Sequence, residues 1–129
     1  LMPRLFKKFS INDFFLFCFL IAALRFFLVY VGHGSLWLLI IAQIMHAITF
    51  GMFHVAGIAA TNKLFTGEYR SRGQALYSSV GFGAGGASGT LASGLVWESL
   101  GGAVTFGMSA LTSLLGVVLI LWVRRHFID

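Results

Sequence analysis

The stretch INDFFLFCFLIAALRFFLVYV, residues 11–31, decides the fold of this chain. Apart from Asp13 near its start and Arg25 in its second half, the stretch carries no charged side chain. A helix needs roughly 20 mostly apolar residues to cross the hydrocarbon core of a bilayer. The stretch meets that requirement and predicts a membrane-spanning helix.

The composition of the whole chain agrees with this prediction. Of the 129 residues, 58% are hydrophobic and 10% are charged, whereas about a quarter of the residues of a soluble domain are charged. We therefore expect the lipid bilayer as a partner, and no nucleic acid despite a net charge of +5. The single cysteine, Cys18, can form no disulfide within the chain and is expected to be a small packing residue.

Three more segments are long and apolar enough to cross a membrane, at about 36–60, 74–97 and 103–123. With residues 11–31 they predict an all-α membrane protein of four transmembrane helices. Because the chain starts at Leu1 and enters the first span almost at once, we expect 1–129 to be a fragment of a longer protein.

The basic residues predict the orientation of the four spans. The connections GHGS and ESLGG contain no lysine or arginine, whereas the other three extramembrane regions contain eight of the nine: Arg4, Lys7, Lys8, Lys63, Arg70, Arg72, Arg124 and Arg125. Positive residues accumulate on the cytoplasmic side of a membrane. The N-terminus, the 61–73 loop and the C-terminus are therefore expected in the cytoplasm, with Trp37 and Trp97 at the outer interface and Trp122 at the inner one.

Polar side chains inside the spans are the candidate functional residues. Arg25 faces either an aqueous cavity or an ion-pair partner, or it extends towards the outer interface, since a charge inside the hydrocarbon is costly. The second span carries Gln43, His46, Thr49 and His54, and a polar stripe on an apolar helix suggests a lining towards water or substrate. The alternative for each histidine is a single hydrogen bond between helices.

The third span contains GFGAGG at 81–86, which matches the G-x-G-x-x-G pattern of dinucleotide-binding loops. That fingerprint needs a preceding strand and an acidic residue about 20 positions later, and both are missing here. Gly81, Gly85 and Gly89 instead recur every four residues, with Ser93 continuing the row. This spacing is typical of close helix packing in lipid.

The remaining polar residues suggest no chemistry. Asp13 follows Ser10 where helix caps are common, Glu98 lies at the outer end of the third span, and His33 and His126 are expected to be solvated. No nucleophile–base pair or metal-ligand cluster can be assembled from the chain. We therefore expect no enzyme, no cofactor and no metal.

The order of QIMHAITFGMFHVAG, GEYRSRGQALYSS and GLVWESLGG resembles the C-terminal part of the major facilitator superfamily. The likeness is greatest to the branch of lactose permease and the phenylpropionate and nucleoside proton symporters. Members are usually twelve-span transporters, so the resemblance implies that this chain covers spans nine to twelve. It also implies that Arg25 and His46 correspond to the arginine and histidine of the proton-coupling and sugar-binding network of lactose permease. Thr49 stands where that network has a proton-carrying glutamate, so the resemblance implies neither proton coupling by that carboxylate nor sugar specificity.

Together, these observations predict part of a secondary transporter of a bacterial inner membrane. Proton-coupled symport of a small organic solute is expected, for example an aromatic or other carboxylic acid, a nucleoside or a sugar. The substrate, protons and the remaining transmembrane helices are the expected partners, and the pathway would use Arg25, His46, Gln43, Thr49 and His54. The alternative is a free-standing four-span protein with a structural or assembly role.

Overall fold

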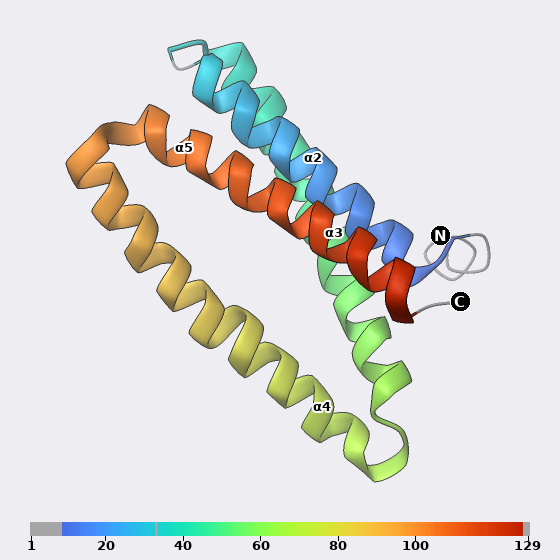
Figure 1. Cartoon of the computed structure of the whole chain (residues 1–129). Helices are drawn as coiled ribbons and strands as arrows, with labels where there is room; N and C mark the ends of the chain where they lie inside the picture. The colour runs from blue at the N-terminus through green and yellow to red at the C-terminus, as the bar shows by residue number, and fades with distance from the viewer. Residues whose placement is uncertain (1–8, 33, 128–129) are drawn as a thin grey trace.

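The computed structural model describes residues 9–32 and 34–127, and these residues form helices and short connections without a strand (Figure 1). The predicted all-α class is therefore confirmed. The elements are α2 (Ile11–Val31), α3 (Leu36–Leu64), the 3-10 turn η1 (Gly67–Tyr69), α4 (Arg70–Tyr77), the π-helix η2 (Ser78–Gly85) and α5 (Gly86–Phe127). The cytoplasmic residues predicted at Arg4, Lys7 and Lys8 and the solvated His33 lie outside the described residues, as does the side chain of His126.

Three helical stretches are long and apolar enough to cross a membrane: Ile11–Val31, Leu36–Leu64 and Gly67–Arg125. The first has the bounds that the sequence predicts. The second continues past the expected residue 60 to Leu64, where Lys63 in the last turn interacts favourably with the helix dipole. The third stretch has 59 residues, which at 1.5 Å per residue amounts to roughly 90 Å, about three bilayer cores.

Gly101 divides this third stretch. Its backbone, with φ 83° and ψ 169°, is the non-helical point inside α5, and it lies in a region that is accessible essentially to glycine alone. The chain reverses there (Figure 1), so we call residues 70–100 the first arm and residues 102–127 the second arm. The sequence placed this break over the whole of ESLGG, but the helix continues to Leu100 and the turn needs one residue.

Trp97 fills the inner side of the bend. A Cβ added at Gly102 would come within 2.7 Å of the Trp97 ring, and the Phe106 ring meets the same indole edge-on at 6.0 Å between centroids. The Trp97 ring of the first arm therefore packs against the start of the second arm.

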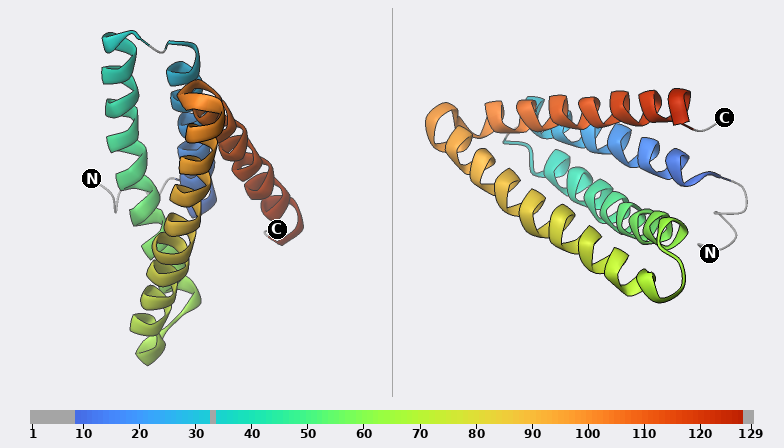
Figure 2. Two further views of the ribbon diagram at one scale, coloured as in Figure 1. Left: turned by 90° about the vertical axis from the view of Figure 1, so that its left-hand side faces the viewer. Right: turned by 60° about the horizontal axis from the view of Figure 1, so that its bottom comes forward.

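The second arm and α3 pack on two sides of α2 (Figure 2). Small side chains line these contacts, as is usual where helices approach closely in a membrane. Against α3, Cys18 Sγ lies 3.5 Å from the carbonyl oxygen of Thr49, and its side chain is 3% exposed. Cys18 is thus the packing residue that the sequence predicts. Against the second arm, Phe19 lies where a Cβ at Gly116 would be.

The start of α2 is fixed by a capping box. Ser10 Oγ accepts from the backbone N–H of Asp13 at 3.2 Å, and Asp13 Oδ2 accepts from the Ser10 N–H at 2.9 Å. The predicted capping role of Asp13 is confirmed. Asp13 Oδ1 also accepts from Arg124 Nη1 at 2.8 Å, which ties the end of the second arm to the start of α2.

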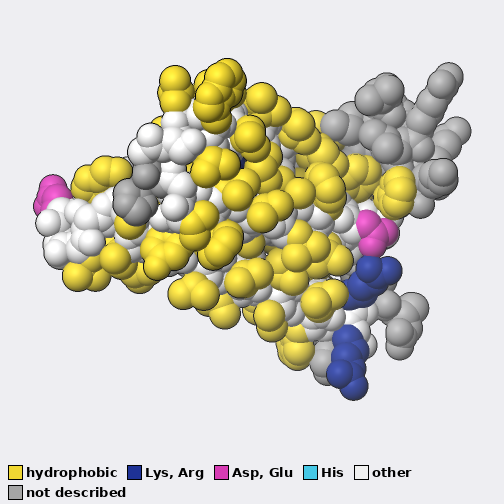
Figure 3. Space-filling view, turned by 90° about the horizontal axis from the view of Figure 1, so that it is seen from above, with side chains coloured by type: hydrophobic (Ala, Val, Ile, Leu, Met, Phe, Trp, Pro, Cys, Tyr) yellow, Lys and Arg dark blue, Asp and Glu magenta, His cyan; other side chains and the backbone are white. Residues whose placement is uncertain are grey.

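The first arm stands away from the rest of the molecule along most of its length (Figures 1 and 2). From Ser78 to Leu100, every residue except Val96 is exposed. Large apolar side chains also cover the face drawn in Figure 3. For a membrane protein such a surface is expected, because lipid or further helices cover it.

The glycine-rich part of the first arm differs from the expected α-helix. Residues 78–85 form a π-helix, a wider winding with i→i+5 hydrogen bonds that is rare and often occurs at functional sites. A Cβ added at Gly81, Gly85 or Gly89 would meet no helix outside the first arm, and Gly89 lines a hollow of about 400 Å³ with Phe19 and Phe26 of α2. A Cβ at Gly89 would meet nothing within 4 Å, and at Gly81 and Gly85 it would meet only neighbours in the same segment.

Candidate functional site

Arg25 lies on α2 with part of its guanidinium enclosed. Its Nε is buried and has no hydrogen-bond partner. Its Cζ lies 4.1 Å from the centroid of the Phe26 ring, a cation–π distance that partly offsets the loss of water. A buried guanidinium nitrogen without a partner is costly, so a group that paired with it would stabilise this side chain.

His46 lies on α3, across the helix interface from α2. The Arg25 guanidinium is close enough for its charge to act on the His46 imidazole. The packing of α2 on α3 thus places two polar residues, 21 positions apart in the sequence, on neighbouring helices. The His46 ring is otherwise exposed and contacts Phe50 at 5.6 Å between centroids.

Gln43 and Thr49, also on α3, have different surroundings. Gln43 is exposed and borders an apolar groove with Ile40 and Ala47. Thr49 is 5% exposed, and its hydroxyl donates to the carbonyl oxygens of Met45 at 2.9 Å and His46 at 3.2 Å. Because its own carbonyl meets Cys18, Thr49 lies at the interface with α2 and not on the face of Gln43 and His54.

His54 belongs to a row of rings between α3 and the first arm. The ring of Phe82 meets His54 at 5.5 Å, Phe50 at 6.2 Å and Tyr77 at 5.7 Å between centroids. With His46 on Phe50, the row runs from the surroundings of Arg25 to the base of the first arm. Tyr77 itself fits against Gly57, where its ring occupies the place of a Cβ.

Sequence reasoning missed Phe50, Tyr77 and Phe82. His46, Phe50 and His54 recur every four residues, and this spacing in the sequence indicates that Phe50 shares a face of α3 with the two histidines. Tyr77 and Phe82, however, are five residues apart and would diverge on an α-helix. The π-helix brings them onto one side, since its turn takes about one residue more.

Carboxylates are remote from this group. In the described part of the chain they are Asp13, Glu68 and Glu98, in the first turn of α2, in η1 and near the Gly101 bend. Among the described residues the ion pair present is that of Asp13 with Arg124. The same residues contain no group of three histidine, cysteine or acidic side chains that could hold a metal ion.

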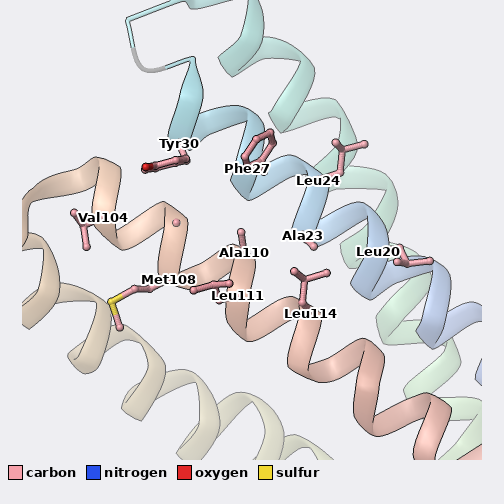
Figure 4. Close-up of a pocket in the computed structure, with 11 residues that line it drawn as sticks. Leu20, Ala23, Leu24, Phe27, Tyr30, Val104, Met108, Ala110, Leu111 and Leu114 are labelled. Carbon is pink, nitrogen blue, oxygen red and sulfur yellow. The ribbon is translucent and has the colours of Figure 1, made fainter.

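An apolar pocket lies between α2 and the second arm (Figure 4). It has a volume of about 630 Å³ and is lined by apolar side chains that include Phe27, Met108 and Leu114, with Tyr30 at one end. Its lining offers no convergent polar groups of the kind that orient a solute. The polar group of Arg25 and His46 is therefore the better candidate site.

Comparison with known proteins identifies the family. The model of the MFS_1 like family matches residues 1–108, which is most of the chain. No curated protein and no solved structure matches the chain. The extent of the family match shows the family. This helical membrane protein belongs to the MFS_1 like family, within the major facilitator superfamily of transporters.

Proposed function

We propose that this chain is the last third of a secondary active transporter that carries a small organic solute together with protons. The solute is an aromatic or other carboxylic acid, a nucleoside or a sugar, and the membrane is the inner membrane of a bacterium. The membership of the family supports transport. The proton coupling and the class of solute are our inference from the residues around Arg25.

The helices would form four spans. α2 and α3 are two, and the reversal at Gly101 makes the two arms of the third stretch the others. Lys63, Arg70 and Arg72 on one connection, with Arg124 and Arg125 after the last span, would face the cytoplasm by the positive-inside rule. Four spans of a twelve-span protein leave a large surface for the remaining helices, in agreement with the exposure of the first arm.

The observation that carries the proposal is the buried Arg25 Nε, which has no hydrogen-bond partner, on a guanidinium within electrostatic range of His46. No described carboxylate neutralises it, so its counter-charge would come from the substrate or from an acidic residue of another span. His46 would accept a hydrogen bond or a proton when that negative charge arrives, because neutral imidazole can do both. Gln43 and His54 would line the path on the same helix, and Thr49 would hold α3 against α2 beside them.

Transport by variants of the full-length protein tests this site. In Arg25→Ala we expect concentrative uptake to fall at least about tenfold, which corresponds to the loss of one charge-assisted hydrogen bond. Arg25→Lys should retain part of the uptake, since it keeps the charge without the planar fork. Uptake is measured for a panel of small carboxylic acids, nucleosides and sugars.

Arg125→Ala is the matched control, because Arg125 is an exposed arginine near the end of α5. It should reach the membrane and transport normally. Arg25→Ala should also reach the membrane in normal amount. Normal uptake by Arg25→Ala would exclude Arg25 from the site.

A further inference from the structure

A groove between α2 and α3 has a carboxylate at its rim. It has a volume of about 640 Å³ and is lined by one acidic and five apolar residues: Phe9, Asp13, Phe14, Phe17, Ile48 and Met52. The rings of Phe9 and Phe14 meet edge-on at 6.4 Å between centroids. An apolar groove with a single carboxylate in its lining fits an amphiphile better than a water-soluble solute.

The rim of this groove lies at the end of the molecule where charged side chains gather. Asp13 is in the first turn of α2, and its partner Arg124 is followed by Arg125 and the end of α5. In Figure 3, basic side chains stand beside an acidic one at one end of a largely apolar face. In a membrane protein, such an end lies at the level of the lipid headgroups, and the apolar part of the groove then lies alongside the acyl chains.

Asp13 and Arg124 leave hydrogen-bonding capacity unused. Asp13 accepts one bond from Arg124 on Oδ1 and two from Ser10 on Oδ2, whereas a carboxylate has about four acceptor positions. Arg124 gives Asp13 one of its guanidinium donors, through Nη1, out of roughly five. The two side chains are 32% and 51% exposed, so both are accessible to a headgroup.

We propose that this groove binds a zwitterionic phospholipid with a primary ammonium in its headgroup. One acyl chain lies along Phe14, Phe17 and Met52. The ammonium donates to Asp13 and the phosphate accepts from Arg124, so the positive and negative groups of the lipid meet side chains of opposite charge. A choline headgroup has no N–H donor and cannot form the bond to Asp13.

Lipid binding to the purified protein tests the proposal. Native mass spectrometry would measure retention of a phosphatidylethanolamine and of the phosphatidylcholine with the same acyl chains. We expect the wild-type protein to retain the ethanolamine lipid about three- to fivefold more strongly, the range of an exposed charged pair. Asp13→Asn should abolish this preference, and Met52→Trp, which fills the groove, should weaken both lipids.

Two further variants separate headgroup recognition from a structural effect of the broken ion pair. Arg124→Gln removes the ion pair but keeps the carboxylate, so it should weaken both lipids and preserve the preference. Glu98→Gln, which alters an exposed carboxylate outside the groove, should change nothing. Equal retention of the two lipids by the wild type, or equal loss of preference in Asp13→Asn and Arg124→Gln, would overturn the proposal.

Discussion

At the scale of single residues, aromatic rings pack into the space that glycines leave by having no side chain. Gly57 on α3 is buried, and the Tyr77 ring lies where its Cβ would be. Phe65 fits against Gly73 in the same way. Gln74 Nε2 donates to Asn62 Oδ1 at 2.9 Å between these two contacts. Together these contacts fix the base of the first arm against α3, although the rest of that arm stands free.

Gly57→Ala should weaken this base. The new methyl group would displace the Tyr77 ring from a closely packed position, and overpacking of this kind costs about 1–3 kcal/mol. Thermal unfolding of the purified protein would measure the change. Gly51→Ala is the control on the same helix, since a Cβ there meets nothing within 4 Å, and it should be neutral or slightly stabilising. Equal melting temperatures for the two variants would contradict this packing role.

At the scale of elements, most of the helices but not their irregularities were predictable. The apolar run predicted the helix Ile11–Val31, and the cap-forming residues Ser10 and Gly32 marked its two ends. The π-winding of Ser78–Gly85 left no comparable signal, since glycine, serine and alanine are compatible with several helical forms. The proximity of Tyr77 and Phe82 depends on that winding, so this part of the candidate site could not be predicted from α-helical spacing.

Gly101→Ala should disturb the bend between the two arms. The native φ of 83° with ψ of 169° is strained for any side chain, at about 1–3 kcal/mol. We expect the second arm to lose its position on α2, where the Phe26 and Phe106 rings lie 6.3 Å apart. Cysteines introduced at these two positions and treated with a bifunctional thiol reagent should cross-link efficiently in the parent protein and poorly in Gly101→Ala.

Gly94→Ala serves as the control for this bend. Gly94 belongs to the first arm, has a helical backbone, and would place its Cβ in open space. Cross-linking should therefore be as efficient as in the parent protein. If Gly101→Ala also cross-links normally, the reversal of the chain does not depend on the backbone freedom of Gly101.

At the scale of the whole molecule, the candidate site depends on which helix faces pack together, and this packing could not be predicted from the sequence. Arg25 and His46 were recognisable separately as polar residues in apolar spans, and the packing of α2 on α3 places them on neighbouring helices. Thr49 looked equivalent to His46 by position in the chain. Its burial against Cys18 separates it from the exposed polar face. Helical spacing alone does not say which face of a span meets a neighbour and which remains open.

The open glycine face of the first arm leads to a prediction for the full-length transporter. A Cβ added at Gly81, Gly85 or Gly89 would meet no helix outside the first arm, and we propose that helices elsewhere in the transporter pack on them. Gly89→Leu should leave the melting temperature of the 129-residue chain unchanged, because the hollow that Gly89 lines has a volume of about 400 Å³ and can hold the side chain. In the full-length protein the same change should lower the melting temperature and uptake, since leucine prevents close approach of helix backbones.

Gly94→Leu distinguishes this face from a general effect of a bulky residue in the arm. Gly94 is five positions from Gly89 and thus points about 140° away from it on an α-helix, with equally open space around its Cβ. It should be tolerated in both proteins. A loss of stability for Gly89→Leu in the short chain as well would place the cause inside these helices, whereas a loss confined to the longer protein requires that another part of the transporter contacts the glycine row.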